Sequence, residues 1–222
     1  MAMVDLKSNS KTPRLILAST SKYRQALMKF LDIPFEAEAS PFDEEPLKSQ
    51  ILDPMALAAA LAEGKALAVL QKYSSQSHLV VIGGDQVAAL TRPDGSVLRL
   101  GKAKTPEKAF EQLSALNGKT HQLMTAIHIC SAQKQASFIN VTHLKMSQLT
   151  DEQLWRYIEL DQPLDCAGSY KIESYGASLF EEITCTDFSA IQGLPLLQMK
   201  NHLADFGFSI FQRKEKSHDK KK

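Results

Sequence analysis

The pattern of apolar and polar positions predicts strands that alternate with helices in the first half of the chain and hairpins in the middle. Residues 15–19 and 79–90 are apolar with no alternating polar face, so we expect strands covered on both sides there. The turn signal Arg92-Pro93-Asp94-Gly95 predicts that 87–90 and 97–100 form a hairpin. Further strands are expected at 34–38, 123–130 and 136–146.

Capping residues mark where the expected helices begin. Four helices follow a favourable N-cap residue, namely Ser21, Asp53, Thr105 and Thr150. Proline comes directly after Asp53 and Thr105, where it suits the first helical position, and Thr150 forms a capping box with Gln153. A last helix follows Pro195 and runs to about residue 203. Helices interleaved with strands and hairpins predict an α/β fold with a mixed sheet.

Composition and charge are those of an ordinary folded chain. The 222 residues are 44% hydrophobic and 23% charged, which favours a single domain at 14–212 between disordered tails at 1–13 and 213–222. The second tail holds six of the 26 basic and two of the 25 acidic residues, which leaves 20 basic and 23 acidic residues elsewhere. Because this remainder is slightly acidic, we expect no stable binding of nucleic acid.

Features that would indicate a membrane or an oxidising compartment are missing from the sequence. No apolar run approaches the roughly 20 residues of a membrane span, and residues 1–13 lack the apolar core of a signal peptide. The cysteines, Cys130, Cys166 and Cys185, are odd in number and unevenly spaced, so they form neither a disulfide framework nor a zinc pattern. We therefore expect a cytoplasmic protein that does not associate with membranes.

Asp85 is a carboxylate in an otherwise apolar stretch and directly follows Gly83-Gly84. Burying a charge costs several kcal/mol unless the charge is paired, protonated or used. The glycine pair indicates either a bulge or a close approach of another group to the backbone. Asp85 is thus either an ordinary turn acid after a strand or a functional carboxylate.

Hydroxyl groups and a cation surround the start of the first helix, between Ser19 and Arg24. The free N–H groups and dipole of a helix N-terminus attract anions, and an arginine adds a bidentate donor, so this segment suits a phosphate. The alternative is a plain serine-capped helix with an exposed arginine.

Three further charged features are candidate functional groups whose roles the local sequence does not decide. Lys65 lies on the apolar stripe of its helix, four residues after Leu61, so its ammonium either reaches solvent or points at a negative group near the core. The acidic loop at 40–46 is either simply solvated or suited to a divalent cation shared with a ligand. Lys102 follows Gly101 where the hairpin ends.

Three stretches together resemble the Maf family, nucleotide pyrophosphatases once described as septum-formation inhibitors. They are residues 15–21 with Arg24, residues 84–87, and residues 166–169 with 193–195. Asp43-Glu44 and Lys65 fall where that family has an acidic pair and a helical lysine. The resemblance covers about residues 13–205 and implies an elongated mixed sheet flanked by helices in two lobes, related to the inosine-triphosphate pyrophosphatases. It also implies hydrolysis of nucleoside triphosphates to monophosphate and pyrophosphate with a divalent cation, Mg²⁺ or Mn²⁺.

The resemblance implies a role for each candidate residue. Asp85 is the expected general base, and Glu44 and Asp85 are the expected metal ligands. The expected substrate-binding residues are Ser19, Ser21, Arg24, Lys65 and Lys102. The chain departs from the family pattern at Gly101-Lys102-Ala103, where the family has Gly-Lys-Pro, and at Thr125-Ala126, where it has Thr-Gly. The first change loosens the loop but keeps the cation, and the second argues against a backbone contact there.

The pair Asp85-Gln86 resembles the 7-methyl-GTP pyrophosphatase branch, whereas the dTTP/UTP branch has Asp-Thr. By the same likeness Tyr23, Gln86 and Glu173 set substrate specificity. Because 7-methylguanine is cationic, it can stack on Tyr23, and Glu173 can accept from its N–H edge. The expected substrate and partner is thus 7-methyl-GTP, and the sequence allows a homodimer. The alternatives are a dTTP or UTP pyrophosphatase, a non-catalytic nucleotide-binding regulator of cell division, and, less favoured, a nucleic-acid binder acting through its tail.

Overall fold

The structure is a computed structural model and describes residues 13–211. The tails expected at 1–13 and 213–222 therefore lie, except for Pro13, outside the described residues. The strands are β1 (Arg14–Leu17), β2 (Glu36–Ala37), β3 (Leu79–Thr91), β4 (Val97–Leu100), β5 (Thr120–Cys130), β6 (Gln135–Met146) and β7 (Phe180–Thr184). The helices are α1 (Lys22–Lys29), α2 (Glu45–Gln50), α3 (Pro54–Lys72), α4 (Pro106–Leu116), α5 (Asp151–Asp161) and α6 (Leu196–Asp205), with 3₁₀ helices η1 (Tyr175–Leu179) and η2 (Phe188–Gln192). In this described range, no helix is both long enough and apolar enough to span a bilayer.

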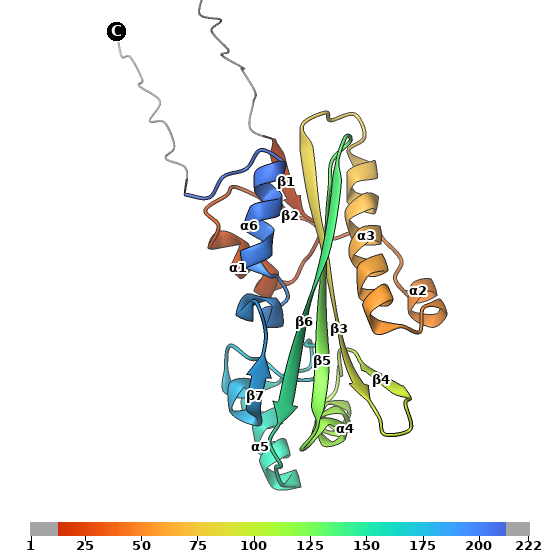
Figure 1. Ribbon diagram of the computed structural model, residues 1–222, viewed down its shortest axis with the longest axis vertical. Coiled ribbons are helices and arrows are strands. Elements are labelled where there is room, and N and C mark those ends of the chain that lie inside the picture. The colour runs from red at the N-terminus through yellow and green to blue at the C-terminus, as the bar shows by residue number, and fades with distance from the viewer. Residues whose placement is uncertain (1–12, 212–222) are drawn as a thin grey trace, which may run out of the picture.

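The strands of the described chain form one seven-stranded sheet in the order β2-β1-β3-β5-β6-β7, with β4 also paired to β3. β1 is parallel to β2 and β3, and the other pairs are antiparallel. β3, β5 and β6 run along most of the molecule, which is therefore elongated (Figure 1). This mixed sheet flanked by helices confirms the expected α/β fold.

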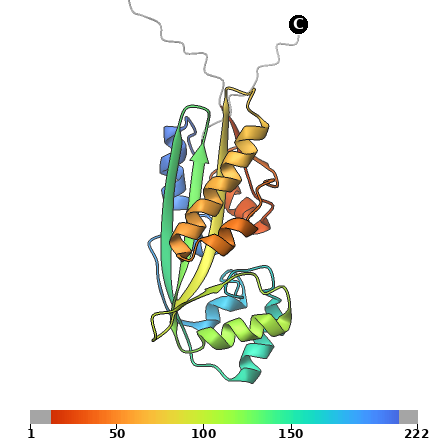
Figure 2. The same cartoon turned by 90° about the vertical axis from the view of Figure 1, so that its right-hand side faces the viewer.

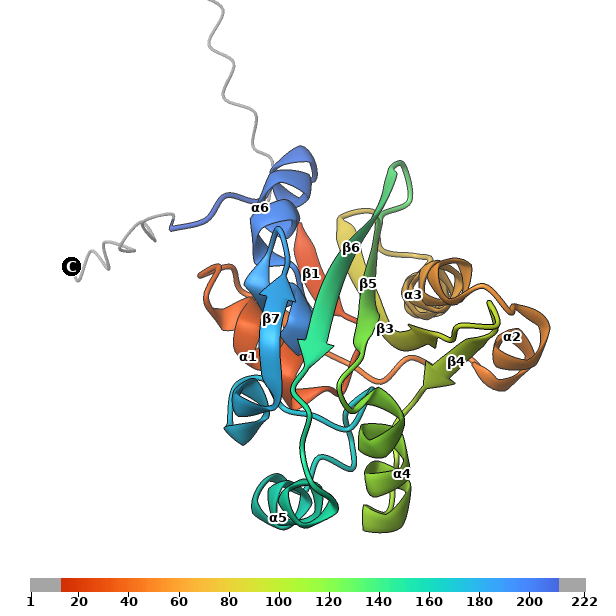
Figure 3. The same cartoon turned by 60° about the horizontal axis from the view of Figure 1, so that its bottom comes forward.

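Helices cover both faces of the sheet (Figure 3). On one face α1 and α6 bury Leu27 and Met199 against side chains of β1, β3 and β5, including Ile82. On the other face α3 packs Val69 against Val81 and its neighbours. At the far end of the long strands α4, α5 and η1 form a separate apolar cluster (Figure 2). These two ends correspond to the two lobes that the family resemblance implies.

One edge of the central strand β3 is paired continuously, whereas the other edge is paired only near the two ends of the strand. On one edge β5 pairs with it continuously from Val81 to Ala89. On the other edge the pairing with β1 stops at Ile82, and the pairing with β4 starts at Ala88. Residues 83–87 therefore have an open edge within the described part of the chain. This opening positions the candidate site.

Gly83 and Gly84 continue β3 without a bulge, so of the two interpretations the close approach is correct. A Cβ atom on Gly83 would lie 2.1 Å from the carbonyl oxygen of Ala62 and 2.8 Å from the amide nitrogen of Ala66, both in α3. Glycine is needed here because any side chain would push the helix away from the strand. The tight packing brings Lys65 of α3 within reach of β3.

Most expected elements are present, with shifted ends. β3 and β4 form the expected hairpin, in which residues 88–91 pair with residues 97–100. Thr150 and Gln153 make both hydrogen bonds of the capping box. The strand expected at 34–38 is reduced to β2, and α2 begins inside the acidic loop at 40–46. The strand β7 was not predicted. Its side chains are exposed or half-buried, and its strand conformation depends on pairing with β6.

Candidate active site

A cleft opens at the unpaired edge of β3. Its cavity has a volume of about 660 Å³, and a neighbouring cavity of about 430 Å³ shares part of its lining. Ligand pockets typically measure roughly 300–1,000 Å³, so a nucleotide fits this size. The larger cavity is lined by Ser21, Tyr23, Arg24, Glu44, Lys65, Asp85, Gln86, Lys102 and Glu173. The remaining candidate, Ser19, lines the neighbouring cavity, so the fold brings all the sequence-predicted site residues to one region.

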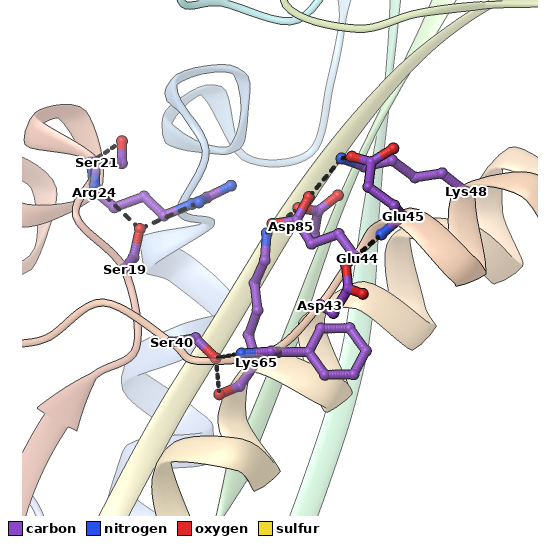
Figure 4. A network of polar contacts seen from close by, with 11 residues as sticks. Ser19, Ser21, Arg24, Ser40, Asp43, Glu44, Glu45, Lys48, Lys65 and Asp85 are labelled. Carbon is purple, nitrogen blue, oxygen red and sulfur yellow. Dashed lines mark hydrogen bonds and ion pairs between the residues drawn. The ribbon is translucent and has the colours of Figure 1, made fainter.

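Asp85 belongs to a chain of alternating charges (Figure 4). The Nζ atom of Lys65 lies 2.6 Å from Asp85 Oδ1 and 2.9 Å from Glu44 Oε1. Glu44 also pairs with Lys48 at 2.9 Å. The side chains of Lys65 and Asp85 are each 13% exposed. Lys65 therefore does not extend to solvent, and Asp85 is a paired carboxylate in the middle of a strand rather than a turn acid.

Glu44 is ionised at neutral pH. Partial burial favours its protonated form, but the ion pairs with Lys65 and Lys48 outweigh burial and lower the pKa of Glu44 to about 2. Within residues 13–211 no group of three or more His, Cys, Asp or Glu side chains could hold a metal by itself. Glu44 and Asp85 fit a divalent cation only when a ligand adds oxygen atoms, which is the usual way in which Mg²⁺ binds beside substrate phosphates.

The start of α1 has the hydrogen bonds that the sequence indicates. Ser21 caps the helix by accepting from the backbone N–H of Arg24 at 3.4 Å. Ser19 Oγ accepts from the Ser21 amide at 3.2 Å and from Arg24 Nη1 at 3.4 Å, and Arg24 Nε donates to the carbonyl of Gly193 at 3.0 Å. Burial lowers the pKa of Arg24, while the charges of Asp85 and Glu44 oppose that shift. Arg24 is thus held in the cleft instead of extending from a plain capped helix.

Lys102 lines both cavities from the segment that follows β4. Its backbone pairs with Ala167 in an isolated antiparallel bridge, and the Lys104 amide donates to Leu164 at 3.0 Å. These bonds hold the loop in which alanine replaces the family's proline. Sequence reasoning missed four charged residues that also line the larger cavity, namely Lys48, Arg99, Lys104 and Asp165. Only Lys48 had a recognisable signal, because it follows Glu44 by one helical turn.

Tyr23 lies in an acidic part of the cleft. Its hydroxyl donates to Asp165 Oδ1 at 3.4 Å. Burial raises the pKa of Tyr23, and Cys166, Asp165 and Glu173 add to the rise. The ammonium of the neighbouring Lys22 lies 5.1 Å from the centre of the Tyr23 ring and 3.9 Å from Asp165 Oδ2. Glu173 is exposed at the cleft.

Gln86 is held by residues far away in the sequence. Its Nε2 atom lies 2.9 Å from Thr125 Oγ1, 3.0 Å from the carbonyl oxygen of Ala190 and 3.1 Å from that of Ile191. Thr125 and Ala126 lie in β5 directly opposite Gln86 and Asp85, and both are buried. The departure from the family's Thr-Gly pattern therefore falls inside the sheet.

The fold and the cleft define a class of α/β protein suited to phosphate-bearing ligands, in which a strand carboxylate lies near a helix N-terminus and several cations. The chain belongs to the Maf family, because the family model described as Maf-like protein matches residues 14–206. It is 46% identical to a protein of Bdellovibrio bacteriovorus named 7-methyl-GTP pyrophosphatase, over 84% of this chain and 93% of the relative. Proteins of the same name from Xanthomonas oryzae pv. oryzae and Pseudoalteromonas atlantica are 38% and 37% identical, over 89% and 90% of this chain and 99% and 98% of the relatives.

Proposed function

We propose that this chain is a nucleoside triphosphate pyrophosphatase that hydrolyses 7-methyl-GTP to the monophosphate and pyrophosphate. One observation carries the proposal: Asp85 lies at an open strand edge, in a cleft that also contains Lys65, Arg24 and Lys102. The relatives named 7-methyl-GTP pyrophosphatase support the choice of base. Neither a dTTP or UTP preference nor a purely regulatory role has an observation in its favour.

In this proposal the triphosphate binds at the N-terminus of α1 and between the lysines. The free amides and the dipole of α1 attract phosphate oxygens, together with the hydroxyls of Ser19 and Ser21. Arg24, Lys65 and Lys102 add positive charge. This charge offsets the repulsion between phosphates and the carboxylates of the cleft, because like charges at short range disfavour binding.

Asp85 acts as the general base in this proposal. It takes a proton from the water that attacks the α-phosphorus, and pyrophosphate leaves. The 2.6 Å contact between Lys65 and Asp85 supports this role, because a phosphate that binds Lys65 lies next to the carboxylate. Positioned general bases contribute roughly 10²–10⁴-fold to the rate.

We further propose that Glu44 and Asp85 bind Mg²⁺ or Mn²⁺ together with the phosphates. Glu44 is suitable because its low pKa keeps it ionised at neutral pH. These two carboxylates would hold the cation together with oxygen atoms of the phosphates and of water, because hard divalent cations take oxygen ligands. When bound, the cation neutralises negative charge on the phosphate oxygens.

The base is recognised at the acidic part of the cleft. Tyr23 stacks on the cationic 7-methylguanine ring, and Glu173 accepts from its N–H edge. The carboxylates of Asp165 and Glu173, which line the same cavity as Tyr23, support this arrangement because they attract a positive charge. Uracil and thymine carry no such charge and lose this contribution.

The substitution Asp85→Asn tests the catalytic role. We expect the rate of pyrophosphate release from 7-methyl-GTP to fall at least 10²-fold, while a non-hydrolysable triphosphate analogue still binds. Asp94→Asn, in the exposed turn between β3 and β4, is the matched control and is expected to keep full activity. Near wild-type turnover by Asp85→Asn would reject the assignment.

A substrate panel and a truncation separate the alternatives. A higher kcat/KM for UTP or dTTP than for 7-methyl-GTP would overturn the choice of base, and binding without turnover would favour the regulator. Deletion of 213–222 is expected to leave hydrolysis unchanged, which argues against a function that resides in the tail. The cytoplasmic location and the homodimer stay predictions.

A further inference from the structure

The side-chain amide of Gln86 can adopt only one orientation. Its Nε2 group faces the carbonyl oxygens of Ala190 and Ile191 at 3.0 Å and 3.1 Å. Carbonyl oxygens only accept hydrogen bonds, so the group that faces them must be the NH₂ group. The opposite orientation would place Oε1 against two backbone oxygens, which leaves three acceptors together without a donor. The chemistry of η2 therefore determines the amide orientation.

Thr125 completes this arrangement from inside the sheet. Its side chain is buried, with 1% of the residue exposed, and it lies opposite Gln86 in the register of β3 and β5. The Thr125 hydroxyl donates to the carbonyl of Ala190 at 2.9 Å, so towards Gln86 it can only accept. The Nε2 group of Gln86 donates to it at 2.9 Å. Thr125 thereby connects the amide of Gln86 to the backbone of η2.

We propose that Thr125 is a positioning residue that, together with η2, holds the Gln86 amide in the place where it presents only a hydrogen-bond acceptor to the base. The inference rests on the proposed function and specifies how the same cleft selects its substrate. Because the NH₂ group is used internally, Oε1 is the part of the amide left for a ligand. The carboxylates of Glu173 and Asp165 also line the cleft and are acceptors when ionised.

A cleft with this set of acceptors selects a base with adjacent N–H donors. Guanine has two such groups, the ring N1–H and the exocyclic amine, whereas uracil has one N–H between two carbonyl acceptors. A site built from acceptors leaves the carbonyls of uracil unpaired, and unpaired polar groups in a protein site strongly reduce affinity. Thr125 thus contributes to base selection without contacting the nucleotide.

The variants Thr125→Val and Thr125→Ser test this inference. Valine keeps the shape of the side chain and removes the hydroxyl, so Gln86 loses one of its fixed partners. We expect Thr125→Val to raise the KM for 7-methyl-GTP about tenfold, with a smaller change in kcat and little change in the KM for UTP. Thr125→Ser restores the hydroxyl and is expected to restore discrimination. An unchanged ratio of kcat/KM values for 7-methyl-GTP and UTP in Thr125→Val would overturn the inference.

A substrate series on the unmodified protein tests the same inference without relying on the folding of a variant. The series compares 7-methyl-GTP with 7-methyl-ITP, which lacks the exocyclic amine, and with 1,7-dimethyl-GTP, which lacks the N1–H donor. At least one analogue is expected to lose tenfold or more in kcat/KM, whereas equal values for all three would overturn the inference. Failure to release pyrophosphate from any of these nucleotides would instead reject the proposed function, and the inference with it.

Discussion

The substitution Gly83→Ala tests whether the contact between α3 and β3 aligns the catalytic groups. A Cβ atom at this position would lie 2.1 Å from the carbonyl oxygen of Ala62, whereas ordinary contact begins at 3.4 Å. The difference means that helix and strand must separate by about 1.3 Å. The neighbouring Gly84 points to the other face, where a Cβ atom would meet the end of the Ile127 side chain at 3.1 Å.

The two glycines therefore differ in what must move. Backbone atoms of a packed helix cannot rotate away, so Gly83→Ala is expected to reach the upper part of the overpacking range, about 3 kcal/mol. Gly84→Ala requires only a small shift of a flexible side chain, and we expect a loss of less than about 1 kcal/mol. Because α3 carries Lys65, a displacement near 1 Å also disturbs its 2.6 Å contact with Asp85. Misplacement of this size can cost about 10²-fold in rate.

Urea unfolding and pyrophosphate release from 7-methyl-GTP measure the two effects on the same preparations. Gly83→Ala is expected to be both less stable and about 10²-fold slower than Gly84→Ala, which is its matched control. Equal stability of the two variants would refute the conclusion that glycine is required for the approach of α3. Loss of stability with full activity would refute the link between this contact and catalysis.

Two further predictions concern the pH dependence of stability. The pKa of Glu44 is lowered to about 2 in the folded protein, so its contribution is present above about pH 4.5 and is lost as the pH falls towards 2. Urea titrations at pH 5 and pH 3 measure how much the free energy of unfolding falls between these two pH values. We expect this fall to be about 1 kcal/mol smaller for Glu44→Gln than for wild type, a figure that takes the partial exposure of Glu44 into account. Burial lowers the pKa of His121 to about 4, so stability is lost as the pH falls from 6.5 towards 4. The free energy of unfolding is therefore expected to fall between pH 7 and pH 5 by about 2 kcal/mol less in His121→Phe than in wild type. For either variant, a pH profile of stability parallel to that of wild type would contradict the prediction.

The sequence predicted the features that neighbouring residues determine. Ser21 and Thr150 cap their helices because the hydroxyl that makes the bond is three residues from the amide that it caps. The strand around Asp85 was recognisable because its apolar run has no polar face. The family motifs then indicated which residues form the candidate site, and all of these candidates line the cleft or its neighbouring cavity.

Contacts between distant parts of the chain were not predictable in this way. Gln86 and the carbonyl of Ala190 are 104 positions apart, and no local pattern indicates that they meet. Lys65 allowed two interpretations because its helix alone does not show what faces it, and only the packing against β3 selects the pair with Asp85. The strand β7 escaped prediction because its conformation depends on the edge of β6.

The open edge of β3 explains how adjacent residues can have different roles in one cleft. Successive side chains of a strand point to opposite faces, so Asp85 turns towards Lys65 of α3 and Gln86 turns towards η2. In a fully paired strand the sheet would separate these two side chains. Because neither β1 nor β4 covers residues 83–87, the cavity extends around the strand and is lined by both. One interruption in strand pairing therefore lets the proposed general base and the proposed base-recognition residue act on the same nucleotide.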